Sequence, residues 1–171
     1  MLNRLWDLGV KVKGQVEGPR HLVRESWDIL QGLPQGKRLY SALLGLYVPY
    51  TGSMGAQVEH IGMGEACVAL KERRGVRNHL RSIHAIALAN LVELAGNLAL
   101  SYSMPVDARF IVSRMEIDYI KKARGTIRAR CRCPIPTSNE RQTYIIPVEV
   151  FNEAGELLVK ATLHSLVGPR H

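Results

Sequence analysis

One long apolar segment in the middle of the 171-residue chain constrains the fold more than any other feature. From Ile83 to Ser103 the residues are mostly apolar and helix-forming, and Pro105 ends the helix because proline lacks an N–H and clashes with the preceding turn. The segment is long enough to cross a bilayer, but Glu93 lies near its middle, where a charge is costly in lipid. We therefore predict a helix buried in protein and no stable membrane insertion.

Alternation of apolar and polar residues predicts strands on both sides of this helix. Two short alternating runs, at residues 54–59 and 66–71, flank a glycine-containing turn and predict a hairpin. After the helix the same period predicts four more strands, at residues 114–119, 127–133, 143–151 and 157–167. One helix and five or six antiparallel strands predict an α+β fold. The sheet is expected to wrap the helix, because no other element is apolar enough to share the core. The free sheet edges favour pairing across a two-fold axis, hence a homodimer or a dimer of dimers.

The cysteines and one proline of these strands carry further expectations. Cys131 and Cys133 alternate with arginines and face the covered side of the sheet, where thiols pack as small hydrophobic groups. With Cys67 they make an odd number without a CxxC pair, so neither a disulfide framework nor a zinc site is indicated. Pro147 predicts a sheet edge or a bulge in its strand.

Residues 1–50 are predicted to form an N-terminal helical extension of the main domain, residues 51–171. One of its helices is expected to begin near Pro19, and another is expected to cover residues 35–46. We expect these helices to cover the domain rather than to contact a membrane, because their basic residues are not segregated on one face. The apolar face of a first helix is approximated by Leu2, Leu5, Trp6 and Val10.

The charge of the chain narrows the classes of partner. A net charge of +8 and a pI near 9.7 favour polyanions or phosphate-bearing small molecules such as coenzyme A. Aromatic residues are only 6 % of the chain and do not alternate with the densest basic run, Lys121, Lys122 and Arg124, so nucleic-acid binding is not expected. The N-terminus lacks the pattern of a signal peptide, which predicts a cytoplasmic location.

Four polar residues form one stripe on the predicted central helix. Asn90, Glu93, Asn97 and Ser101 follow one another by three or four positions and so share a face. One interpretation is a polar dimer interface in which the side chains of the stripe find hydrogen-bond partners. The other is a cleft in which Glu93 acts as a base or a nucleophile.

The start of the same helix offers a second chemical group. The first N–H groups of a helix have no intrahelical partner and favour developing negative charge. The Ala85 N–H could therefore donate to the oxygen of a carbonyl under attack. Glu93 lies eight residues further on, roughly 12 Å along the helix axis. If the two groups act together, the glutamate must come from a second subunit, which predicts a site at a dimer interface.

The order of elements resembles the hotdog fold, and the segment from Asn78 to Glu93 resembles the active-site segment of hotdog acyl-CoA thioesterases of the phenylacetate and 4-hydroxybenzoyl type. In that family an amide residue precedes a His-Gly-Gly turn and an acidic residue follows on the helix. The resemblance implies that Asn78 is the amide, His84 the histidine, Ala85 the N–H that polarises the thioester, and Glu93 the acid that attacks it or activates water. The stretches PYTGSMGA, RNHL, HAIALANL and KKARG also look like an uncharacterised bacterial hotdog subfamily.

The chain departs from the family pattern where Ala85 and Ile86 replace the two glycines. The replacement either reshapes the pocket for another acyl group or abolishes catalysis while binding is retained. His79 and His84 either contribute to the site or only cap and orient the turn. The further residues expected to contact the substrate are Asn90, Asn97, His79 and Ile86, with Lys121, Lys122 and Arg124 at the phosphates of coenzyme A.

The function that the resemblance implies is hydrolysis of an acyl-CoA or acyl-carrier-protein thioester, with coenzyme A as part of the substrate and with no other cofactor and no metal. One alternative is a non-catalytic protein that binds acyl-CoA or fatty acyl groups on the same fold. A second is a hotdog dehydratase of enoyl thioesters, in which His84 and Glu93 pair across the dimer. A third is a membrane-surface or structural protein that uses the N-terminal helices.

Overall fold

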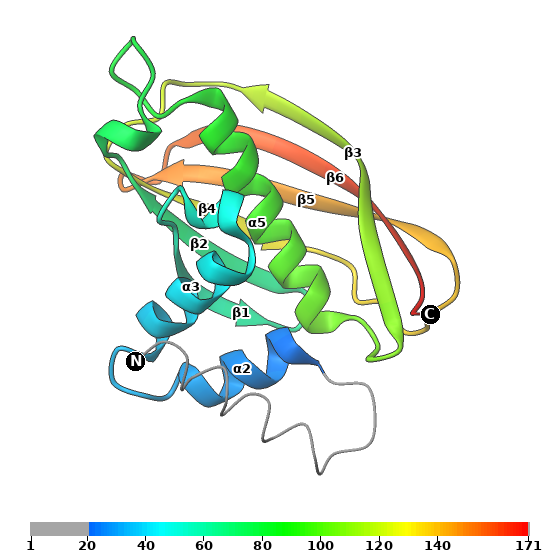
Figure 1. Ribbon diagram of the computed structural model, residues 1–171. Helices are drawn as coiled ribbons and strands as arrows, with labels where there is room; N and C mark the ends of the chain where they lie inside the picture. The colour runs from blue at the N-terminus through cyan, green and yellow to red at the C-terminus, as the bar shows by residue number, and fades with distance from the viewer. Residues whose placement is uncertain (1–20, 171) are drawn as a thin grey trace.

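The computed structural model describes residues 21–170 and confirms the predicted α+β architecture. A six-stranded antiparallel sheet, in the order β1-β2-β4-β5-β6-β3, curves around the long helix α5 (Figure 1). The strands are β1 (Gln57–Gly62), β2 (Glu65–Lys71), β3 (Ala108–Tyr119), β4 (Thr126–Arg132), β5 (Gln142–Asn152) and β6 (Leu157–Pro169). The helices are α2 (Leu22–Leu30), α3 (Gly36–Tyr47), α4 (Pro49–Gly52) and α5 (Ala85–Ser103), with a 3-10 turn at Arg74–Val76.

Helix α5 is the centre of the hydrophobic core, as predicted. Leu91, Ala95 and Ala99 on its sheet-facing side are fully buried. A Cβ added to Gly96 would lie 2.4 Å from Leu163 Cδ1, so the glycine lets the helix approach β6 closely. By length and composition α5 could cross a membrane, but half of its most apolar stretch is buried against the rest of the protein.

Helices α2 and α3 lie on the same side of the sheet as α5 (Figure 1). Trp27 of α2 is fully buried and meets Tyr40 of α3 edge to face, with ring centroids 5.1 Å apart. The expectation that only α5 and the sheet share the core was therefore wrong, because two large aromatic rings dock these otherwise amphipathic helices. The Tyr102 hydroxyl at the end of α5 donates to Asp28 at 2.8 Å, which ties α2 to the central helix.

The two predicted helices near residue 19 and at residues 35–46 correspond to α2 and α3. The first predicted helix, with Leu2, Leu5, Trp6 and Val10, lies outside the described residues. The domain boundary at residue 50 stays a prediction.

Two strands begin at other positions than predicted, and a β-bulge accompanies each difference. β1 begins at Gln57, because α4 and a turn with Gly55 at φ +66° occupy the preceding residues. A bulge between Val58 and His60 then lets both Val58 and Ile61 face the core. β3 begins at Ala108, and its bulge lies between Val112 and Arg114. Each bulge inserts one residue and so interrupts the period of two.

The remaining strand details agree in part with the sequence. Cys131 is buried and Cys133 is half-buried against the core, and hydrogen bonding to Cys133 together with burial raises the pKa of the Cys131 thiol. β5 lies inside the sheet, but its pairing with β4 ends at Val148, so Pro147 has only β6 as a neighbour. The proline thus lies at a local edge, while the irregular register with β6 falls between Val150 and Phe151, where Leu158 is the extra residue of β6.

Candidate active site

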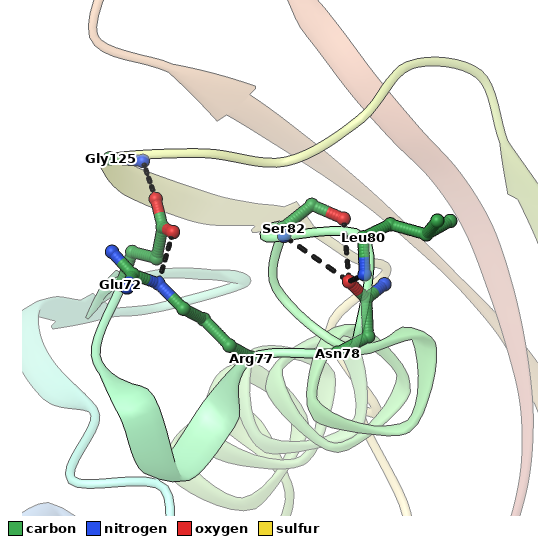
Figure 2. A network of polar contacts seen from close by, with 6 residues as sticks. All are labelled: Glu72, Arg77, Asn78, Leu80, Ser82 and Gly125. Atoms are coloured by element: carbon green, nitrogen blue, oxygen red, sulfur yellow. Dashed lines mark hydrogen bonds and ion pairs between the residues drawn. The ribbon is translucent and has the colours of Figure 1, made fainter.

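Two loops meet at the start of α5, one following β2 and one following β3. The backbone N–H of Ile83 donates to the Ala123 carbonyl at 2.9 Å. The Glu72 carboxylate accepts the Gly125 N–H at 2.7 Å and the Arg77 Nε–H at 2.5 Å (Figure 2). These hydrogen bonds, of which the one from Gly125 has the largest effect, hold the pKa of Glu72 below its ordinary value of 4.5. Glu72 was not singled out from the sequence, since an acid within a basic run normally indicates only a solvated surface.

Asn78 organises the loop that leads into α5. Its Oδ1 accepts the Leu80 N–H at 2.9 Å, and both the N–H and the hydroxyl of Ser82 at 3.2 Å (Figure 2). The turn carries Arg81 at φ +54°, a left-handed conformation that an L-residue rarely adopts. His79 is exposed on the same turn. The Asn78 oxygen is therefore engaged in loop structure, and its role toward a substrate stays a prediction.

His84 caps the N-terminus of α5. Its Nδ1 accepts the Ile86 N–H at 3.1 Å, and its backbone is extended, at φ −65° and ψ 142°. An imidazole nitrogen that accepts a hydrogen bond is unprotonated, so a neutral His84 carries its proton on Nε2. Within residues 21–170 the Ala85 N–H has no hydrogen-bond partner, while the Tyr119 hydroxyl donates to the Ala85 carbonyl at 3.2 Å. The helix start thus presents a free N–H donor next to an imidazole.

A pocket of about 210 Å³ lies at this helix start. Three segments line it: the turn around α4, the residues just after β2, and the first two turns of α5. It brings together His84, Ile86 and Asn90, three of the residues that the sequence assigned to the site. The wall formed by Tyr50, Ser53, Met54 and residues 75–77 was not predicted, because only the tertiary fold places these segments beside α5.

The predicted polar stripe of α5 is divided among different surroundings. Asn90 lines the pocket, and its Oδ1 accepts the Thr51 hydroxyl at 3.0 Å. Half-buried Glu93 accepts from Asn97 Nδ2 at 3.5 Å. The Asn97 Oδ1 is buried, and the described chain supplies it with no partner. Ser101 lines a separate cavity of about 370 Å³ near the other end of the helix.

Glu93 and Ala85 are not brought together within one chain, since they lie on one straight helix about 12 Å apart along its axis. The basic run after β3 contacts the loop that leads into α5, because the carbonyl of Ala123 in its middle accepts the Ile83 N–H. Lys121, Lys122 and Arg124 are all exposed, and Lys121 pairs with Glu156 at 2.9 Å. Nowhere in residues 21–170 do three His, Cys, Asp or Glu side chains gather closely enough to hold a metal ion.

A sequence family described as a domain of unknown function, DUF4442, matches residues 36–167. This chain belongs to the DUF4442 family. The matched range contains the pocket and every predicted site residue. Among curated proteins no sequence matches that of this DUF4442 chain.

Solved structures confirm the predicted hotdog fold. A structural-genomics protein is similar to this DUF4442 chain at 27 % identity and a TM-score of 0.75, over 87 % of this chain and 99 % of the other. A protein of unknown function from Pseudomonas aeruginosa, described as a probable thioesterase, has 22 % identity and a TM-score of 0.70, over 81 % and 97 % of the two chains. A hypothetical thioesterase from Streptococcus pneumoniae, solved with coenzyme A, has 18 % identity and a TM-score of 0.61, over 74 % and 99 %.

Proposed function

We propose that this protein hydrolyses the thioester of an acyl-CoA or an acyl-carrier protein. The observation that carries the proposal is the Ala85 N–H at the start of α5, which has no partner in the described chain and lies between His84 and Ile86, two residues that line the pocket. The resemblance of the Asn78–Glu93 segment to hotdog thioesterases supports it. So do the names of two structures similar in fold, one of them solved with coenzyme A.

In the proposed reaction the thioester carbonyl lies at the start of α5 and accepts the Ala85 N–H. The proton on His84 Nε2 supplies a second donor, since Nδ1 is engaged by Ile86. Negative charge develops on the carbonyl oxygen during attack, and donors fixed at a helix N-terminus stabilise it.

Glu93 of a second copy supplies the base in this proposal. Its carboxylate removes a proton from water as the water oxygen attacks the carbonyl carbon. The carbon–sulfur bond then breaks, and the thiolate of coenzyme A takes the proton from the Glu93 carboxyl. Alternatively the Glu93 carboxylate attacks the carbonyl carbon, the carbon–sulfur bond breaks and the coenzyme A thiolate leaves. Water then hydrolyses the resulting anhydride, which releases the acid and restores the carboxylate.

The phosphates of coenzyme A would lie along the basic loop after β3. Lys122 and Arg124 are exposed there, while the Gly125 N–H is already engaged by Glu72, so these two side chains are the groups offered to the phosphates. Screening by solvent makes each contact weak alone, so several cations are needed together.

The direct test of the proposal is the substitution Glu93→Gln. Glutamine keeps the size of the side chain and can still accept a hydrogen bond from Asn97, so only the charge is lost. We expect thiol release from a panel of acyl-CoA esters to fall about 10²–10⁴-fold, the usual contribution of a general base. The matched control is Glu140→Gln, an exposed acid on a loop, which should leave the rate unchanged. Hydrolysis at the wild-type rate in Glu93→Gln would contradict the proposal.

One observation favours a second candidate, a non-catalytic acyl-CoA-binding protein. Ile86 replaces the second glycine of the family pattern, and its side chain is 55 % exposed at the pocket. An apolar side chain there can hold an acyl group while crowding the approach of water. Thermal stabilisation by acyl-CoA esters without release of free thiol would favour this candidate.

A further inference from the structure

A second cavity, of about 250 Å³, lies between α3, α4, the start of β1 and the flank of α5. Its wall on the α3 and α4 side is built from small residues, among them Ala42, Gly45 and Gly52. Leu94 of α5 forms part of the opposite wall. Neither the predicted site residues nor the proposed mechanism uses this cavity.

Apolar groups form most of the lining of this cavity, and its polar side chains are two hydroxyl groups and the exposed amide of Gln57. The Ser41 hydroxyl donates to the Lys37 carbonyl at 2.8 Å and accepts the Val58 N–H at 2.9 Å. The Thr51 hydroxyl donates to Asn90 at 3.0 Å. Since both hydroxyl protons are already used, an occupant would gain little from polar groups, and an apolar occupant suits the site best.

The cavity adjoins the pocket at the start of α5. Thr51 lines the cavity, Asn90 lines the pocket, and the two side chains are hydrogen bonded, so this pair lies on the wall between the two spaces. Leu94 follows Asn90 by four residues and therefore lies one turn further along the same helix face. A hydrocarbon chain that starts at Ala85 would enter the cavity beside Asn90, where the Thr51–Asn90 hydrogen bond forms the boundary.

A close approach of two helices limits the size of this cavity. A Cβ on Gly52 would lie 2.3 Å from the Gly45 carbonyl oxygen, so α3 and α4 touch through their backbones. The hydrogen bond between Thr51 and Asn90 links this wall to α5. A cavity of about 150 Å³ accepts a six-carbon ring, so 250 Å³ has room for roughly eight to twelve carbon atoms.

We propose that this cavity holds the hydrocarbon end of the acyl group, and that α3 and α4 thereby select medium-length apolar acyl chains. The inference rests on the proposed function, because it takes the thioester to lie at the start of α5. It adds the substrate class and the residues that determine chain length. Ala42 and Leu94 are those residues, one on each wall.

The test changes the cavity from both walls and measures kcat/KM for straight-chain acyl-CoA esters from two to sixteen carbons. Ala42 is exposed on α3, so Ala42→Phe should fold and narrow the cavity. We expect at least a tenfold loss for the ester that the wild-type protein prefers, and a shift of the optimum to shorter chains, since each methylene contributes roughly tenfold or more. Leu94→Ala should shift the optimum to longer chains. Leu43→Ala, on the neighbouring groove of α3, is the matched control and should leave the profile unchanged.

The outcomes separate this inference from the proposed function. Wild-type hydrolysis with the same chain-length profile in both variants overturns the cavity assignment but leaves thioester hydrolysis intact. If the wild-type protein hydrolyses no ester, the proposed function fails, and the same ester series is then tested by thermal shift. Thermal stabilisation that peaks at medium-length esters, and at shorter esters in Ala42→Phe, supports the assignment of the cavity to the acyl chain. Stabilisation that is independent of chain length in both proteins overturns that assignment.

Discussion

His84 combines two roles that can be separated by substitution. Its Nδ1 caps α5 by accepting the Ile86 N–H, and its Nε2 proton is offered to the proposed carbonyl. We expect His84→Ala to lose the cap and about 0.5–1 kcal/mol of stability, or about 1–4 °C in Tm. Asparagine is a good N-cap, so His84→Asn should keep the Tm while lowering kcat. Thermal melts and thioester assays on both variants check this, and an equal loss of Tm in both would show that the imidazole does more than cap.

At the scale of single residues the sequence predicted the positions of candidate groups better than it predicted their partners. The spacing of His84, Ala85 and Glu93 placed an N–H donor at the start of the helix and an acid two turns away, and the structure has both. The sequence could not show that the Asn78 side-chain oxygen accepts hydrogen bonds from Leu80 and Ser82, because these bonds depend on the turn that the loop adopts. Hydrogen-bond partners of a loop residue follow from its backbone geometry, which residue identity alone does not determine.

At the scale of elements, the carboxylate of Glu72 holds two loops together. Glu72 links the loop after β2 to the loop after β3 through Arg77 and Gly125, and its side chain is only 12 % exposed. Because the pKa of Glu72 is lowered in the folded protein, its contribution to stability is present above pH 4.5 and is lost as the pH falls through the lower folded value. We expect Glu72→Gln to lower the Tm at pH 7 by about 2–4 °C, as for loss of one charge-assisted hydrogen bond. The Tm difference from wild type should shrink as the pH falls below 4.5 and close below the lowered pKa of Glu72 in the folded protein, and Glu140→Gln should show no such difference at neutral or acidic pH.

The elements themselves were predicted where their periodicity is uninterrupted. β2, β4, β5 and α5 keep one period throughout and lie where the sequence placed them, and β6 keeps its period from Val159 onward. β1 and the first half of β3 were misplaced or missed, because their bulges shift the inward positions by one residue. In β3 the side chains of Phe110, Val112, Met115 and Ile117 pack against the core at spacings of two, three and two. A strict alternation test detects only the second half of such a strand.

At the scale of the whole molecule, the sequence predicted the sheet around α5 and a cover of N-terminal helices, but neither the surface on which α2 and α3 pack nor the short helix α4. Trp27 and Tyr40 dock these helices on the core, and α4 then forms walls of both the pocket and the neighbouring cavity. Single aromatic residues in short amphipathic helices give no indication of which surface they will meet. The part of the site that is specific to this chain thus comes from its least predictable region.

The outer edges of β1 and β3 have no strand partner within the described chain. The proposed dimer would remove one of these edges and bring a second α5 beside the first. The proposed reaction requires this assembly, because about 12 Å of helix separates Ala85 from Glu93 in one chain. A test for shared sites needs two variants, each lacking one of the two groups.

Ala85→Pro removes the N–H donor and little else. Proline suits the first position of a helix, and the extended backbone of His84 is compatible with a following proline. Both Ala85→Pro and Glu93→Gln should be inactive alone, while Ala85→Gly keeps the N–H and serves as control. When the two variants are refolded together in equal amounts, half of the dimers contain one chain of each. Each mixed dimer has one complete site out of two, so about a quarter of the wild-type activity should return. Activity that stays at the level of the single variants, with mixed dimers shown by affinity tags, would place both groups in one chain and exclude the shared site.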